Sequence, residues 1–103
     1  MTPAAWLRAR TADAPPELLD AMLAPLCDDG EVPESLASGA MTLFERVLGG
    51  SGGRQDALPL LAADALLTHA LEAQAELDPD GLRAFVERWG AAGRLGDLAV
   101  HPE

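Results

Sequence analysis

The stretch that decides the fold is residues 57–77, which read ALPLLAADALLTHALEAQAEL. Its apolar residues recur every three or four positions, the spacing of one face of an α helix. Asp56 stands directly before the stretch as a candidate cap, and Pro59 falls in the first turn, where a missing N–H is tolerated. We therefore predict one long central helix over 57–77. Its predicted core face consists of Leu60, Ala63, Leu66, Leu67, Ala70, Leu71, Ala73 and Leu77.

Shorter helices are predicted on both sides of this central helix, each with a proline close to its start. No segment alternates apolar and polar residues with a period of two, and β-branched residues do not cluster, so nothing indicates a sheet. The predicted fold class is therefore all-α, a small helical bundle of four to five helices. The shorter predicted helices cover residues 3–10, 16–24, 33–48 and 79–89.

A chain of 103 residues has the length of one domain, and we predict a single helical domain over 1–103. The Gly-rich stretch 49–53, GGSGG, is predicted to be a flexible connector between two helical halves. Such a connector would also allow two copies of the chain to exchange halves. Near the C-terminus, Leu95 and Leu98 are expected to dock as a short turn or a strand-like tail.

The composition indicates the kind of genome that encodes the protein and limits the classes of partner that it can bind. Lys, Asn, Ile and Tyr are absent, which indicates a bacterial genome of high GC content. Seventeen Asp and Glu oppose seven basic residues, giving a formal net charge of -10. So acidic a chain is not expected to bind nucleic acid or an anionic membrane, and it would attract a basic partner. No long apolar run and no export segment is present, so we expect a cytoplasmic protein.

One constellation of titratable residues lies along the predicted central helix. His69, Glu72 and Glu76 follow one side of it, and Asp64 lies about a turn before His69. Such a polar face is a candidate acid/base or metal-dependent site, whereas the alternative is a solvent-facing side with a weak ion pair between His69 and Glu72. Metal sites in helical bundles take Glu-x-x-His pairs from several helices, and here His-x-x-Glu occurs once. We therefore predict no metal and no cofactor.

A second set of residues forms a candidate interface. Leu58 and Leu61 share the side of the central helix that carries Glu72, so this apolar surface must be covered by the first helix or by a partner chain. Gln74 projects from the predicted apolar face, where an amide without a partner is costly. It is predicted to bond to a neighbouring helix or to fix the register of a subunit interface. The candidate interface residues are Trp6, Leu58, Leu61 and Gln74.

These patterns favour a small non-catalytic helical module that acts by protein–protein contact, in a regulatory role. It is expected to self-associate as a homodimer or larger homo-oligomer, or to bind another protein. Two alternatives stay open. One is a small enzyme or metal-dependent site around His69, Glu72 and Glu76. The other is an acidic antagonist of a basic partner, of the antitoxin or anti-sigma type.

Overall fold

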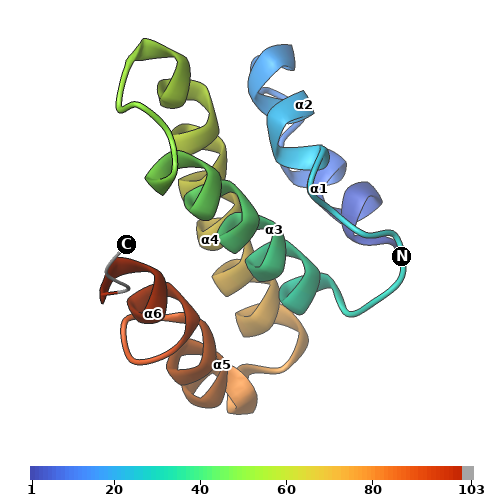
Figure 1. The fold of residues 1–103 in the computed structure, drawn as a ribbon. Coiled ribbons are helices and arrows are strands. Elements are labelled where there is room, and N and C mark those ends of the chain that lie inside the picture. Colours follow the sequence, from blue (N-terminus) through green and yellow to red (C-terminus); the bar gives the residue numbers. More distant parts are fainter. Residues whose placement is uncertain (101–103) are drawn as a thin grey trace.

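The computed structural model describes residues 1–100, and every regular element in that range is helical (Figure 1). Two 3₁₀ turns lead directly into the fourth and fifth α helices, η1 (Arg54–Asp56) and η2 (Pro79–Gly81). The predicted all-α bundle with a long central helix is confirmed. The α helices are α1 (Pro3–Arg10), α2 (Pro16–Leu23), α3 (Val32–Leu48), α4 (Ala57–Leu77), α5 (Leu82–Trp89) and α6 (Arg94–Val100).

Helices α3 and α4 run antiparallel and side by side through the centre, with α1 and α2 on one side and α5 and α6 on the other (Figure 1). Their buried faces are rich in alanine. Because small side chains let two helix backbones approach closely, α3 and α4 make the most extensive contact in the molecule. The fully buried alanines of the two helices are Ala37, Ala40, Ala62, Ala63, Ala70 and Ala73.

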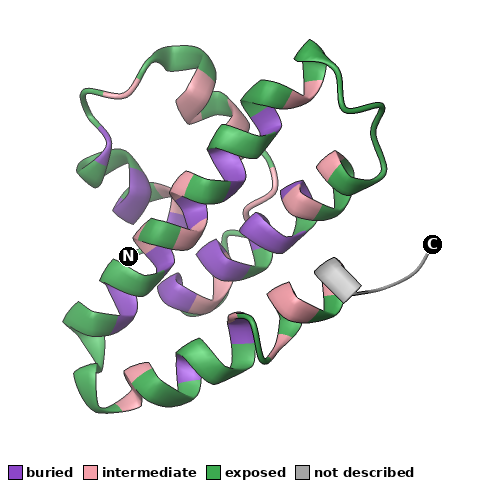
Figure 2. Ribbon diagram, turned by 90° about the vertical axis from the view of Figure 1, so that its left-hand side faces the viewer, coloured by how far each residue is buried: buried purple, intermediate pink, exposed green. Residues whose placement is uncertain are grey.

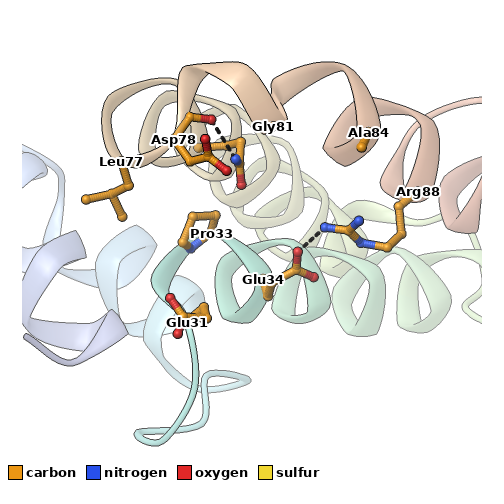
Figure 3. A pocket seen from close by; sticks show the side chains of 9 residues that line it. Glu31, Pro33, Glu34, Leu77, Asp78, Gly81, Ala84 and Arg88 are labelled. Atoms are coloured by element: carbon orange, nitrogen blue, oxygen red, sulfur yellow. Dashed lines mark hydrogen bonds and ion pairs between the residues drawn. The ribbon is translucent and has the colours of Figure 1, made fainter.

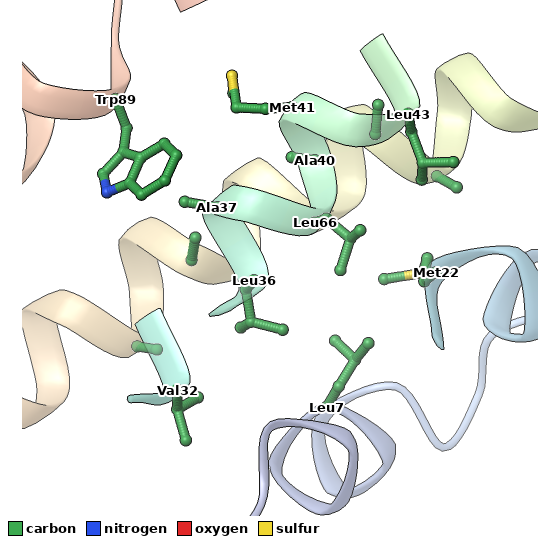
Figure 4. Close-up of a cluster of buried hydrophobic side chains, with 14 of the residues drawn as sticks. Leu7, Met22, Val32, Leu36, Ala37, Ala40, Met41, Leu43, Leu66 and Trp89 are labelled. Carbon is green, nitrogen blue, oxygen red and sulfur yellow. The ribbon is translucent and has the colours of Figure 1, made fainter. Parts of the chain in front are cut away.

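The larger core side chains come from the surrounding helices as well as from this pair (Figure 4). Leu7 of α1 and Met22 of α2 approach Leu66 from one side, and Trp89 of α5 covers the other. Within residues 1–100, no buried side-chain nitrogen or oxygen lacks a hydrogen-bond partner. The buried polar side chains Thr11 and Gln74 are accordingly both hydrogen-bonded.

The buried face of α4 is narrower than the sequence predicts (Figure 2). Ala63, Leu66, Ala70 and Ala73 are fully buried, as predicted. In contrast, Leu60, Leu71 and Leu77 are exposed by 46, 37 and 60%, so their assignment to the core is wrong. A close alanine contact buries only a narrow stripe, and the helices around α3 and α4 leave the edges of α4 uncovered.

The glycine connector is ordered by Asp56, which does not cap α4 as predicted. The Asp56 side chain makes no capping bond at α4. Its carboxylate instead accepts a hydrogen bond of 2.8 Å from the Gly52 N–H, and Gly52 has a positive φ of 77° that favours glycine. A Cβ at Gly50 would lie 2.6 Å from the same carboxylate, so a larger residue there would have to displace it.

The chain after α5 also differs from the sequence prediction. Residues 94–100 form the short helix α6, where a turn or strand-like tail was expected. The backbone folds back at Gly90, whose carbonyl accepts hydrogen bonds from the N–H groups of Gly93 and Gly96 at 3.0 and 3.1 Å. This turn brings Leu95 and Leu98 of α6 against the core.

The centre of α4 should dominate stability. Replacing Leu66, which is fully buried, with alanine leaves a cavity between α3 and α4. We expect Leu66→Ala to lower the free energy of unfolding by about 2–5 kcal/mol, measured by urea denaturation. The matched control is Leu71→Ala on the exposed edge of the same helix, with an expected loss of less than about 1 kcal/mol. Equal losses at the two positions would contradict the narrow buried face.

Candidate functional site

The candidate polar face of α4 forms part of a contact with α1. His69 Nδ1 lies 2.7 Å from Glu72 Oε1, and the imidazole meets the Trp6 ring edge-on at a centroid distance of 6.3 Å. The predicted pair of His69 and Glu72 is therefore present. The tryptophan places one side of the imidazole against α1 rather than against an open cavity.

Glu76 is held by a residue that the sequence did not single out. Both Arg10 guanidinium nitrogens Nη1 and Nη2 donate to the Glu76 carboxylate, Nη1 at 2.5 Å, and the Arg10 guanidinium lies 4.5 Å from the Trp6 ring centroid. These hydrogen bonds hold the pKa of Glu76 below its ordinary value and raise that of Arg10. We call Trp6, Arg10, His69, Glu72 and Glu76 the α1 cluster.

Asp64 does not belong to the α1 cluster. Its side chain is exposed, and its backbone carbonyl accepts a hydrogen bond from the Thr68 hydroxyl at 3.0 Å. Residues five apart on a helix point in different directions, so Asp64 and His69 do not meet. The carboxylate that contacts His69 Nδ1 is that of Glu72.

The α1 cluster offers little for metal or acid/base chemistry. Within the described residues, no group of three or more His, Cys, Asp or Glu side chains is placed to hold a metal ion. Glu76 is turned toward Arg10 and away from His69 and Glu72, which bond to each other. Each ionisable group of the cluster is thus engaged in attaching α1 to α4 or in a local pair.

A second polar cluster attaches α5 to the start of α3, and we call it the α5 cluster. Glu34 accepts a hydrogen bond from the Trp89 indole N–H at 3.0 Å through one oxygen and from Arg88 through the other. It borders a cleft of about 410 Å³ that also includes Glu31, Asp78 and Arg88 (Figure 3). The indole is mostly buried, so Glu34 satisfies a donor that would otherwise be unpaired.

The structure divides the candidate interface residues into two groups. Trp6 and Gln74 are buried within the chain, and the Gln74 amide donates to the Asp78 carbonyl at 2.9 Å. Gln74 thus bonds at the end of its own helix, and both residues are largely covered within the chain. Leu58 and Leu61 are exposed by 39 and 59%, so these two are the accessible members of the set.

Exposed leucines gather where α3 and α4 meet the glycine connector, and we call Leu48, Leu58, Leu60 and Leu61 the leucine end. Beside them lies an apolar groove of about 170 Å³ between α3, α4 and α6. Every residue that lines it is apolar: Phe44, Val47, Leu48, Leu60, Leu95 and Leu98. The sequence did not reveal this groove, because α6, which supplies one wall, was expected to be a tail.

A wider polar cleft of about 410 Å³ adjoins the apolar groove and shares Leu48 and Leu98 with it. Arg94, Glu45 and Asp97 line this cleft, so charges of both signs stand beside the apolar lining. His69, Glu72 and Glu76 line neither space. The feature of the described surface that best suits a macromolecular contact is therefore the leucine end with its groove.

Comparisons with protein-family models, with curated proteins and with solved structures find no match to this chain. Among the helices of the described part, none is both long and apolar enough to cross a membrane. Function is therefore inferred from the geometry of the chain itself.

The hydrogen bonds between Arg10 and Glu76 make a testable electrostatic prediction. In the wild type, NMR titration should show the pKa of Glu76 below the ordinary range, and Arg10→Met should return it to that range. Because the folded-state pKa is the lower one, the pair stabilises the fold above the unfolded-state pKa. That contribution is lost as pH falls through the folded-state pKa. A Glu76 titration that is unchanged in Arg10→Met would contradict the contact.

The α5 cluster predicts a difference between two substitutions of Glu34. Glu34→Ala leaves the largely buried Trp89 N–H without its acceptor, and we expect a loss of about 1–3 kcal/mol in the free energy of unfolding. Glu34→Gln keeps an acceptor oxygen and loses only the exposed ion pair with Arg88, so its cost should be less than about 1 kcal/mol. Chemical denaturation followed by tryptophan fluorescence measures both, and equal costs would rule out the indole bond.

Proposed function

We propose that this protein is a non-catalytic helical interaction module that self-associates through its leucine end. The observation that carries the proposal is the concentration of four exposed leucines beside an apolar groove at one end of the α3–α4 pair. Exposed apolar side chains beside an apolar groove are typical of sites for protein contact. We further propose a regulatory role in a bacterial cytoplasm; the absence of Lys, Asn, Ile and Tyr supports the bacterial origin.

The charge distribution favours a second copy over a basic partner at this surface. The formal net charge of -10 makes two copies repel each other over most approaches. Residues 45–61 and 94–98, which surround the groove, carry equal numbers of basic and acidic side chains, so the excess acid lies entirely elsewhere. These balanced residues are Arg46, Arg54 and Arg94 against Glu45, Asp56 and Asp97.

The two alternative functions have less support in the geometry. An enzyme built on His69, Glu72 and Glu76 needs a pocket in which these groups are free to act, whereas they pair with each other or with Arg10. An acidic antagonist would bind its basic partner through the acidic remainder of the surface. That alternative leaves the neutral leucine end without a role.

Light scattering after size exclusion tests self-association. Each chain has a mass of 10.7 kDa, and we expect the measured mass to rise toward twice that value as the concentration increases from micromolar to millimolar. Leu61→Glu should shift this transition to higher concentration, because a charge would have to be buried in the contact. A mass that stays at one chain throughout would reject the proposal.

The matched control for this experiment is Leu77→Glu. Leu77 is 60% exposed and Leu61 is 59% exposed, and they lie at opposite ends of α4. Circular dichroism should show equal helix content in both variants. If Leu77→Glu weakens association as much as Leu61→Glu does, the contact is not confined to the leucine end.

A further inference from the structure

The cleft beside the α5 cluster contains a buried amide whose oxygen the fold leaves without a partner. Gln74 lines this cleft and is only 8% exposed, and its Nε2 donates to the Asp78 carbonyl at 2.9 Å. Only the nitrogen of a carboxamide can donate, so this bond leaves Oε1 as an acceptor. No group in the described part of the chain donates to Oε1, yet no fully enclosed oxygen there lacks a partner. The Gln74 oxygen is therefore open to the cleft.

Two carboxylates that line the same cleft are also unused by the fold. Glu31 precedes α3 and Asp78 precedes η2, positions from which a side chain can cap a helix, but neither makes a capping bond. Neither carboxylate forms an ion pair with another described residue. Arg88 also lines the cleft, but its charge is matched by Glu34. The cleft thus offers hydrogen-bond acceptors together with the uncompensated charges of Glu31 and Asp78.

The remaining lining suits a short aliphatic chain. Pro33 of α3, Leu77 of α4 and Ala84 of α5 contribute apolar side chains to the cleft (Figure 3). A Cβ at Gly81 would lie 2.5 Å from an Asp78 carboxylate oxygen, so the glycine keeps that group accessible. The volume of about 410 Å³ falls within the roughly 300–1,000 Å³ of sites that hold small molecules.

The acceptors of the cleft suit an organic cation better than a metal ion. Coordination requires several ligand atoms within about 2.0–2.6 Å of one point, and no three His, Cys, Asp or Glu side chains among residues 1–100 are placed in this way. Hydrogen bonds from a charged nitrogen span about 2.7–2.9 Å, and an ammonium group has three N–H donors. Such a group reaches acceptors that stand too far apart for a metal.

We propose that this cleft binds an alkylammonium, a primary amine in its charged form on a short aliphatic chain. The ammonium group donates to Gln74 Oε1 and to the Asp78 carboxylate, Glu31 adds a second negative charge, and the methylene groups lie against Leu77 and Pro33. A free amine carries this group, and so does a lysine side chain of another protein. The cleft is at the C-terminal end of α4, and the leucine end is at its start, so the two proposals are independent.

The binding can be observed directly because the chain has only two carboxamide side chains, Gln55 and Gln74. We expect n-butylammonium chloride, titrated at constant ionic strength, to shift the Gln74 side-chain NH₂ signals in nitrogen–proton NMR and leave those of Gln55 unchanged. The dissociation constant should be about 1–10 mM, since so small a ligand makes few contacts. Tetramethylammonium carries the same charge but no N–H donor, and it should bind about tenfold more weakly. Equal effects of the two cations would overturn the proposal.

Two aspartates provide a matched pair of variants. Asp78→Asn and Asp80→Asn each remove one negative charge from an exposed position, but only Asp78 lines the cleft. Asp78→Asn also keeps the backbone carbonyl that Gln74 bonds. We expect Asp78→Asn to weaken butylammonium binding about threefold and Asp80→Asn to leave it unchanged. Equal weakening would show that the cation is attracted by the acidic surface in general, and the cleft site would then be rejected.

Filling the cleft without changing any charge gives an independent test. Ala84 is exposed on α5, so Ala84→Leu should keep the fold, which circular dichroism checks, while its larger side chain occupies the cleft. Butylammonium should then no longer shift the Gln74 signals. Full binding by a folded Ala84→Leu variant would place the ligand elsewhere and contradict the proposal.

A blocked tripeptide with a central lysine distinguishes the two sources of the ammonium group. Binding about tenfold tighter than that of butylammonium would assign the cleft to a lysine of a partner protein, and weaker binding would assign it to a free amine. If neither probe shifts the Gln74 signals, the proposed site is overturned. Self-association at the leucine end would be unaffected by that result.

Discussion

Close contact between the alanine-rich faces of α3 and α4 is the constraint on which the rest of the structure depends. Fully buried alanines such as Ala40 and Ala70 let the two backbones approach closely. Two closely packed helices cover only a narrow stripe of each other. Larger residues at the margins must then be covered by α1, α2, α5 and α6 or stay exposed, and the exposed leucines of α4 follow from this geometry.

The two polar clusters complete this arrangement, because each attaches a short peripheral helix to the central pair. A helix of eight residues has little stability of its own, so α1 and α5 need tertiary contacts to persist. Each of these two helices buries the ring of a tryptophan. An arginine near that tryptophan on the same helix bonds to a glutamate of α3 or α4. Arg10 reaches Glu76 on α4, and Arg88 reaches Glu34 on α3. Residues that resemble a catalytic constellation in the sequence are thus placed as attachments for α1.

The sequence predicted what depends on local signals. Proline and periodicity predicted helices at about 3–10 and 57–77, which the structure contains as α1 and α4. It did not predict what depends on the relative placement of distant segments. Arg10 and Glu76 are 66 residues apart, and nothing in the spacing of either indicates the other. Likewise, the apolar groove exists only once α6 folds back beside α3. Helical periodicity also overestimated the width of the core face of α4. Periodicity indicates which residues share one side of a helix, but not how much of that side the neighbouring helices cover.

On the proposed self-association, the charge pattern favours contact at one location. An apolar patch that fits a different surface of the next copy leads to open chains of subunits, whereas a patch that fits itself closes at two. In this chain the exposed leucines and the groove share one end of the α3–α4 pair, and residues 45–61 and 94–98 around them carry no net charge. The balanced charge around the leucine end therefore lowers the repulsion that two acidic copies would meet there.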